Sequence, residues 1–201
     1  MRYVSGYDGG DCFFVAPVRV AKDSAGVAGF AKTSDRFDDF DRAFSREIGF
    51  SPDITGQIVW TSQCPAVDFL RRLRPDGQAA PILDLKSISV RNGQSLVGEI
   101  RGYGNQTVDL LQVQDDGLVR NLTDMLREDG DAKVFDLPVS RGGAGGPLPQ
   151  LLLVVVSPQS LSTLKTDRPI PGDLFFPAVL SEAATKGYKL GATARLFLLR
   201  G

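Results

Sequence analysis

The sequence predicts an α+β fold in two domains: a small β-β-α-β-α layer domain at residues 1–74 and a β-sandwich-like domain with one helix at residues 82–201. The first observation behind this prediction is a break in the pattern. Residues 75–81 are polar, carry proline and glycine and show no periodicity, so we interpret them as a linker. The second is a stripe of phenylalanines at helical spacing before the break. The third is a series of short strand-like segments with glycine-rich turns after it.

The first domain opens with two strand-like segments, residues 11–20 and 25–33, joined by a turn. A helix follows, because apolar side chains recur at spacings of three, four and four residues; they are Phe37, Phe40, Phe44 and Ile48. Ser34 or Asp35 can cap the start of this helix, and Gly49 can end it in a left-handed conformation.

A third strand is expected at residues 53–62 and a short helix at residues 64–74. Pro65 fits the first position of that helix, where its missing N–H costs nothing, and Cys64 comes just before it. Trp60 lies in the alternating stretch of the third strand, so we expect it to pack in the core beside Cys64. One helix on a short sheet would complete this domain.

The second domain is mostly strand. Residues 94–104 and 106–114 predict two strands joined in a hairpin by a turn from Gly102 to Asn105. A second hairpin turn is expected at residues 115–118, where glycine supplies the positive φ. An alternating strand is expected at residues 133–139, a glycine-rich loop at 141–147 and a buried strand at 148–157. A helix from about Pro177 to residue 187 and a closing strand at 190–200 complete the domain. About six or seven short strands of this kind are typical of a β-sandwich.

Charge and composition exclude several classes of function. The 23 basic and 24 acidic residues nearly cancel, so no broad basic field exists to hold nucleic acid. No apolar run reaches the roughly 18 residues of a membrane helix. The chain has no histidine, which removes the usual general base and the commonest metal ligand. Histidine-based nucleophile systems and structural zinc sites are thereby excluded, and we expect no catalytic residue, no metal and no cofactor.

Cys12 and Cys64 are the two cysteines, and each is expected at the edge of a regular element. We weigh three interpretations: a disulfide that ties helix to sheet, two buried free thiols, and a redox pair. The disulfide is favoured because it would close a long loop and stabilise a small domain by about 4 kcal/mol. The C-x-x-C spacing of many redox pairs is missing. A disulfide predicts an extracytoplasmic, periplasmic location, and free thiols predict the cytoplasm.

Asp8, Asp11, Trp60 and Tyr103 are the candidate ligand-binding residues. The glycines between Asp8 and Asp11 can form a tight turn that brings Cys12 to its partner, or they can offer their amides to an anion; we favour the turn. Trp60 and Tyr103 are the aromatic candidates for stacking on a sugar. Tyr103 flanks a turn, so we expect it to be exposed.

Two sets of carboxylates have both a chemical and a plainer interpretation. The first set is Asp8, Asp11, Asp35, Asp38, Asp39 and Asp41. These carboxylates could supply calcium ligands, but their spacing is not that of an EF-hand. We therefore prefer the interpretation that they form a solvated helix face. The second is Glu99 and Asp109, which are expected on neighbouring strands and could in principle serve glycoside hydrolysis. Because they alternate outward with Arg101, a surface salt bridge is the preferred interpretation.

Six segments together resemble a known family: YDGGDCFFVAPV, GFSPDI, QCPAVDFLRRL, DDGLVRNLT, GDAKVFDLPV and FPAVLSEAATKG. They resemble the C-terminal accessory region of serine/threonine protein kinases from soil alphaproteobacteria, in which the kinase domain comes first. The second half also resembles a bacterial domain of unknown function that occurs beside caspase-like peptidases and kinases. The resemblance implies an accessory module whose kinase domain precedes it on a longer chain. The kinase motifs themselves are absent from this sequence.

The sequence therefore predicts a non-enzymatic accessory, sensor or protein-interaction module associated with a bacterial signalling kinase. The partner is expected to be a protein or an envelope ligand. The alternative is a cell-envelope module that binds glycan or peptidoglycan, which an exposed aromatic side chain or a polar cleft near Trp60 or Tyr103 would favour. A carboxylate-based hydrolase is a third hypothesis, and it needs two acidic side chains that face each other in a cleft.

Overall fold

The computed structural model describes residues 2–73, 80–140 and 145–201. It confirms the α+β class, with several sheets and few helices. The chain divides into two compact units, Met1–Pro75 and Asp76–Gly201, which we call the first and second unit. The predicted linker at 75–81 lies outside the described residues apart from its last two positions, and the predicted loop at 141–147 apart from its last three.

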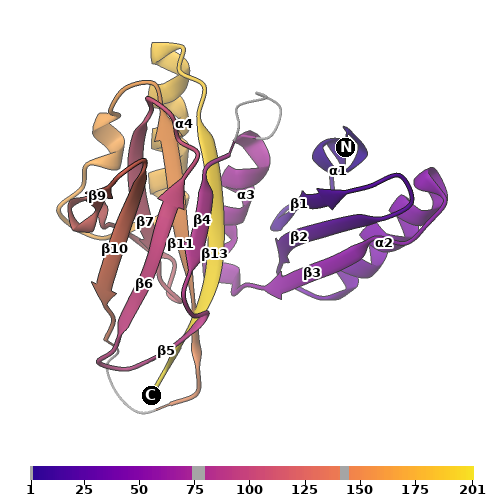
Figure 1. Cartoon of the computed structure of the whole chain (residues 1–201), viewed down its shortest axis with the longest axis horizontal. Helices are drawn as coiled ribbons and strands as arrows, with labels where there is room; N and C mark the ends of the chain where they lie inside the picture. Colours follow the sequence, from indigo (N-terminus) through magenta and orange to yellow (C-terminus); the bar gives the residue numbers. More distant parts are fainter. Residues whose placement is uncertain (1, 74–79, 141–144) are drawn as a thin grey trace. The chain divides into compact units, whose positions relative to one another are not determined.

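A three-stranded sheet forms the base of the first unit (Figure 1). β1 (Phe13–Val20) pairs antiparallel with β2 (Ala25–Ala31), and β2 pairs parallel with β3 (Asp53–Ile58). α2 (Asp35–Ile48) makes the crossover that a parallel pair requires, and α3 (Cys64–Leu73) follows β3. The predicted order β-β-α-β-α is thus confirmed.

The apolar stripe of α2 forms the core of the first unit. Phe37, Phe40 and Phe44 are 8%, 0% and 0% exposed. They pack against apolar side chains of β1 and β2, among them Phe13 and Val27. Burying a phenylalanine stabilises a fold by about 2 kcal/mol, so this contact holds α2 on the sheet.

The start of α2 differs from the prediction, whereas its end does not. Gly49 ends the helix in the left-handed conformation, with φ 92°. Ser34 makes no side-chain cap hydrogen bond, so the expected serine cap is wrong. Its φ of −69° and ψ of −32° are already helical, whereas a capping side chain reaches the free amides from an extended backbone. A short unpredicted helix, α1 (Arg2–Gly6), precedes β1 and adds Val4 to the core.

β3 is shorter than the expected strand at residues 53–62. A 3-10 turn, η1 (Thr61–Gln63), lies between it and α3. The side-chain oxygen of Gln63 accepts a hydrogen bond of 3.1 Å from the Trp60 N–H, which closes this turn. Trp60 therefore lies outside the strand, and α3 begins at Cys64, so Pro65 is its second residue and not its first.

Two sheets that pack face to face form the second unit (Figure 1). The smaller sheet has the strand order β4-β6-β10-β9, and the larger has β12-β8-β7-β11-β13-β5. The strands are β4 (Ile82–Leu85), β5 (Ser89–Arg91), β6 (Ser95–Arg101), β7 (Thr107–Val113), β8 (Leu118–Asn121), β9 (Arg127–Asp129), β10 (Ala132–Pro138), β11 (Leu148–Ser157), β12 (Ile170–Pro171) and β13 (Gly191–Arg200). The core between the sheets takes side chains from both, including Leu96, Ile100, Phe135, Leu110, Val154 and Phe197. The sandwich-like architecture is thus confirmed.

The predicted hairpin between β6 and β7 is wrong. β6 belongs to the smaller sheet and β7 to the larger, so the chain crosses from one sheet to the other between them. Gly102 and Gly104 make this crossing with φ of 71° and 56°, which glycine adopts without steric cost. The second predicted turn does form a hairpin, between β7 and β8, with Gly117 at φ 85°.

α4 (Gly172–Lys186) starts earlier than predicted and carries Pro177 in its interior. Proline inside a helix costs about 3 kcal/mol, which is why Pro177 looked like a helix start. Phe175 and Phe176 are each 2% exposed, and burying their rings outweighs that cost. α4 contacts β8 and β12 of the larger sheet. β11, at the centre of that sheet, is buried from Pro149 to Ser157 on both of its faces.

Candidate functional site

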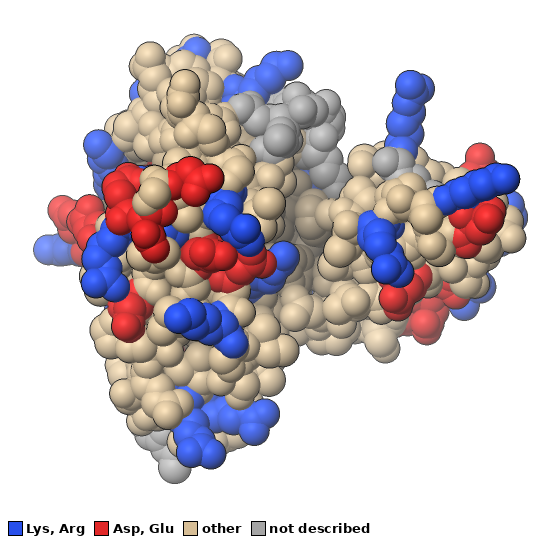
Figure 2. Space-filling view, in the orientation of Figure 1, with Lys and Arg blue, Asp and Glu red and all other residues tan. Residues whose placement is uncertain are grey.

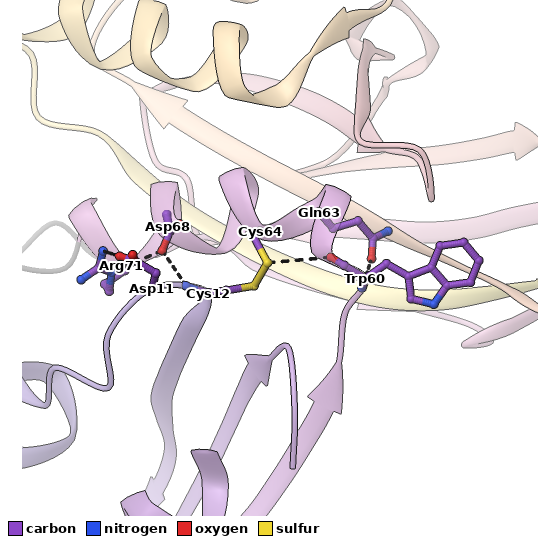
Figure 3. The surroundings of a disulfide bond; sticks show 7 residues. All are labelled: Asp11, Cys12, Trp60, Gln63, Cys64, Asp68 and Arg71. Atoms are coloured by element: carbon purple, nitrogen blue, oxygen red, sulfur yellow. Dashed lines mark hydrogen bonds and ion pairs between the residues drawn. A yellow bond between two sulfur atoms is a disulfide. The ribbon is translucent and has the colours of Figure 1, made fainter. Parts of the chain in front are cut away.

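The two cysteines form a disulfide, with an S–S distance of 2.02 Å and a Cα–Cα distance of 4.8 Å (Figure 3). It joins Cys12, just before β1, to Cys64 at the start of α3. Of the three interpretations of these cysteines, the structure shows the disulfide that ties helix to sheet. Cys12 is 5% exposed and has φ 55°, a left-handed conformation that is uncommon for residues other than glycine.

Asp8 and Asp11 both contact Arg71 of α3, while their side chains remain 74% and 93% exposed. Their Oδ1 atoms each lie 3.2 Å from the Arg71 guanidinium. Asp68 also contacts Arg71, at 3.5 Å, and its Oδ1 accepts a 2.9 Å hydrogen bond from the Cys12 N–H (Figure 3). Sequence reasoning missed Asp68 and Arg71, although their spacing of three residues on one helix face was a readable signal.

The two glycines between Asp8 and Asp11 take part in contacts within the protein that shape this loop. The Gly10 N–H donates to Asp8 Oδ1 at 3.0 Å, and Arg36 Nη1 donates to the Gly9 carbonyl at 3.1 Å. A Cβ atom at Gly9 would lie 2.2 Å from the ring of Phe13, so only glycine fits there. The favoured interpretation, a tight turn that delivers Cys12 to its partner, agrees with this geometry.

Trp60 lies on the surface, which contradicts the prediction that it packs in the core. Its side chain is 45% exposed because the chain leaves β3 at Ile58 and turns at η1. The backbone around it is nevertheless fixed. The Trp60 N–H donates to Gln63, and the Cys64 Sγ lies 3.9 Å from the Trp60 carbonyl oxygen (Figure 3). The indole is therefore an exposed aromatic group on a well-anchored turn.

Tyr103 is half-buried, which contradicts its expected exposure. It packs against the sandwich core at the crossing from β6 to β7. Lys133 Nζ lies 5.7 Å from the centroid of its ring. Because the core and a lysine already contact this ring, Tyr103 is a poor platform for stacking on a sugar.

Two acidic side chains of α2 have local partners. Asp39 forms an ion pair with Arg42, and Asp41 accepts a 3.3 Å hydrogen bond from Ser45. Within residues 2–73, 80–140 and 145–201, no group of three or more acidic or cysteine side chains is placed to hold a metal ion.

The predicted surface salt bridge forms for Glu99 but not for Asp109, because β6 and β7 lie in different sheets and Asp109 is buried. Glu99 lies 3.3 Å from Arg101 Nε, and Arg101 also contacts Asp84 at 2.6 Å. Asp109 is buried at 3% exposure and accepts a 3.4 Å hydrogen bond from the Thr123 hydroxyl. Burial raises the pKa of Asp109 to about 6. These two carboxylates cannot act together as a hydrolase pair.

A pocket of about 490 Å³ lies on the outer face of the smaller sheet. Side chains alternate along its strands, so Leu96, Ile100 and Phe135 point into the core and their neighbours point outward. The outward side chains that line the pocket include Asp84, Val97, Glu99, Arg127, Val134 and Asp136. Sequence reasoning missed this site, because residues from four strands compose it and no single segment carries it.

The register of the strands orders these side chains into rows. Asp84, Glu99, Val134 and Arg127 face one another in turn across β4, β6, β10 and β9, and Val97 faces Asp136 in the next row. Acidic and basic side chains stand side by side on the second unit in Figure 2. The arrangement can recognise a ligand through charges of both signs and a small apolar floor.

Comparison of the chain with protein-family models, curated proteins and solved structures found no match. The resemblance to a kinase-associated region therefore stays a prediction. None of the described helices is long and apolar enough to span a membrane.

Proposed function

We propose that this chain is a non-catalytic accessory module that binds a protein partner beside a bacterial signalling kinase. The observation that carries the proposal is the pocket on the outer face of the smaller sheet. There, charged groups of both signs and two valines are held on four neighbouring strands. Hydrogen-bonded strands keep such groups at fixed spacing, and complementary charge at fixed spacing gives an interface its specificity.

The distribution of the carboxylates supports binding over catalysis. Catalytic carboxyl groups have shifted pKa values and stand where they touch the substrate. Among the described residues, the carboxylate with a clearly raised pKa is Asp109, which lies on the larger sheet and does not line this pocket. Asp84 and Glu99, which do line it, each contact Arg101 instead.

The proposed location is extracytoplasmic, in the periplasm. The disulfide between Cys12 and Cys64 supports it, because such bonds persist in oxidising compartments and are rare in the cytosol. A sensor region outside the cytoplasm would suit a kinase that responds to conditions in the envelope.

Site-directed photo-cross-linking in cells tests the proposed function. A photoreactive amino acid replaces Lys86, which is exposed in the pocket and leaves its carboxylates in place, and in a matched variant it replaces Asp38, which is exposed on α2. We expect a discrete cross-linked protein from position 86 and none from position 38. Equal labelling at both positions, no protein adduct at 86, or substrate turnover by the purified chain would contradict the proposal.

Trp60 favours the second candidate function, a module that binds envelope glycan. Its indole is 45% exposed and sits on a fixed turn, and aromatic faces of this kind stack on sugar rings. Trp60 is the sole tryptophan, so intrinsic fluorescence reports on it alone. If glycan binding is the function, soluble peptidoglycan fragments will shift this emission, and Trp60→Ala will abolish co-sedimentation with cell-wall material while Tyr103→Ala retains it. Unchanged emission at saturating fragment would exclude this candidate.

A further inference from the structure

We infer that the pocket on the smaller sheet accepts a lysine or arginine side chain from an extended segment of the partner protein. The inference rests on the proposed function and names the chemistry of the partner. Three features of the pocket lead to it: its charge, its apolar floor, and the positions of its cations.

The charge of the pocket favours a cation. Its lining carries four carboxylates, on Asp84, Glu99, Asp129 and Asp136, against the two cationic side chains of Lys86 and Arg127. Arg101, at the end of β6 and outside the lining, contacts Asp84 and Glu99. Asp136 forms no ion pair within the described part of the chain, so its charge remains available to a ligand.

The floor of the pocket favours a cation on a long aliphatic stem. Val97 and Val134 are half-buried and lie on the two central strands, β6 and β10. Each valine faces a carboxylate across the strands: Val97 faces Asp136, and Val134 faces Glu99. Facing Cβ atoms lie about 5 Å apart. A lysine or arginine stem can therefore cover a valine while its charged head reaches the carboxylate beside it.

The edges of the face favour a protein segment over a free polyamine. Lys86 follows β4 and Arg127 belongs to β9, and β4 and β9 are the two edge strands of this sheet. The sheet is about 14 Å wide between its edge strands. A segment that crosses it would place a basic side chain at the centre and could offer backbone carbonyls or an acidic residue to the cations at the edges. A polyamine would meet repulsion there.

Fluorescence anisotropy with short labelled peptides tests the inference on the whole chain. The probe is an acetylated and amidated serine peptide with one central lysine, and a version with glutamate in place of that lysine is its charge control. A third version carries 2,3-diaminopropionate, which lacks three methylenes, and all three peptides are compared in mildly acidic buffer, where its more acidic amine is also an ammonium. We expect the lysine peptide to bind, the glutamate peptide not to bind, and the diaminopropionate peptide to bind about tenfold more weakly because it cannot cover the valines. Added salt weakens binding, since the charges are exposed.

Variants of the chain locate the binding. The double variant Glu99→Gln/Asp136→Asn should lose about tenfold in affinity for the lysine peptide, because it removes the two carboxylates that face the valines. Asp38→Asn, on α2, should bind as the parent chain does. Both carry exposed or half-exposed substitutions, and an unchanged unfolding midpoint will show that they are folded.

Several results would overturn the inference. One is that the glutamate or diaminopropionate peptide binds as tightly as the lysine peptide. Another is that the double variant binds the lysine peptide as tightly as the parent chain does. A third is that spermidine at the same concentration displaces the lysine peptide, because that result would indicate a site for small cations. If position 86 cross-links to a protein but the lysine peptide does not bind, this inference fails and the proposed function stands. If the cross-link is also absent, both fail.

Discussion

Asp109 is a buried carboxylate, and burial makes its ionisation unfavourable. It is 3% exposed on β7, with one oxygen accepting from Thr123 at 3.4 Å. Among the described residues its other oxygen, Oδ2, has no hydrogen-bond partner. Burial raises its pKa from 3.8 to about 6, more than the hydrogen bonds of Thr123 and Asn121 and the charge of Lys165 lower it.

The raised pKa predicts that Asp109 destabilises the fold at neutral pH. The folded protein holds this proton more tightly than the unfolded chain does, so the stabilising contribution of Asp109 is fully present below its unfolded pKa of 3.8 and is lost as the pH rises through about 6. We expect Asp109→Asn to be more stable than the parent above that pH by about 2–3 kcal/mol. Urea unfolding of both proteins at pH 4, 5, 6 and 7 measures the difference.

The matched control for Asp109→Asn is Asp124→Asn, which removes an exposed carboxylate near Thr123. It should change stability by less than about 0.5 kcal/mol at every pH. A stability difference between Asp109→Asn and the parent that does not grow with pH would show that Asp109 ionises as freely as a surface carboxylate.

Asp68 and Asp11 both contact Arg71 but differ in their other hydrogen bonds. Both contact Arg71, yet Asp68 also accepts the N–H of Cys12, which is 5% exposed. Asp68→Ala leaves that N–H without its acceptor, so we expect a loss of about 1–3 kcal/mol in the free energy of unfolding. Asp11 is 93% exposed in its side chain, so Asp11→Ala should cost under about 1 kcal/mol. Thermal unfolding under non-reducing conditions compares them, and equal losses would contradict this ranking.

The residues that sequence reasoning misplaced share one cause. Trp60 and Asp109 were assigned to an inside or an outside from alternation along one strand. Trp60 is exposed because β3 ends at Ile58, and Asp109 is buried because the larger sheet is covered on both faces. Alternation reports which residues share a face, but the length of a strand and the number of covered faces depend on the rest of the fold. The disulfide between Cys12 and Cys64 was predictable, because the sequence contains two cysteines and each is the other's sole possible disulfide partner within the chain.

At the scale of elements, Glu182 joins α4 to the turn η4 (Ser162–Leu164). Its two carboxylate oxygens accept the N–H and hydroxyl of Ser162, both at 2.9 Å, and those of Thr163 at 2.8 and 2.7 Å. Lys186 Nζ lies 2.7 Å from the same carboxylate. Hydrogen bonds from Lys186 and Thr163 hold the pKa of Glu182 well below its usual value.

We expect Glu182→Gln to loosen η4, because an amide offers one acceptor oxygen in place of two and carries no charge. Amide hydrogen exchange at Ser162 and Thr163 should become about tenfold faster, with little change in β11. In the parent chain the contribution of Glu182 is present above the usual glutamate pKa and is lost as the pH falls through its depressed pKa. The exchange contrast should therefore shrink in acid. If Ser162 and Thr163 exchange at the same rate in parent and variant at pH 7, Glu182 does not stabilise this turn.

The elements with strong local signals were predictable, and those set by partners were not. The stripe of α2 and the glycine turn at Gly117 formed as expected. The strands β4, β5, β9 and β12 were not predicted, because two to four residues carry too little alternation to recognise. The pocket was missed for the same reason, since β9 supplies Arg127 and β4 supplies Asp84. Pairing across sheets decides such strands, and a single sequence does not display it.

At the scale of the whole molecule, each unit has its own core. The core of the first unit takes residues from α1, the sheet and α2, and that of the second takes residues from both layers of the sandwich. The disulfide lies entirely within the first unit, between Cys12 and Cys64. The first unit is small and contributes a thin core, so the covalent link should matter most there.

Reduction of the disulfide is therefore expected to destabilise the first unit selectively, by about 4 kcal/mol on the chain-entropy argument. Hydrogen exchange followed by mass spectrometry on the whole chain, with and without reductant, resolves the two units. Peptides from β1, β2 and α3 should lose protection on reduction, while peptides from β6, β10 and β11 keep theirs. Cys12→Ser/Cys64→Ser should reproduce the reduced pattern without reductant, and adding reductant to it should change nothing further. Equal loss of protection in β11 would show that the disulfide supports the whole chain, and unchanged protection in β1 would show that the first unit does not need it.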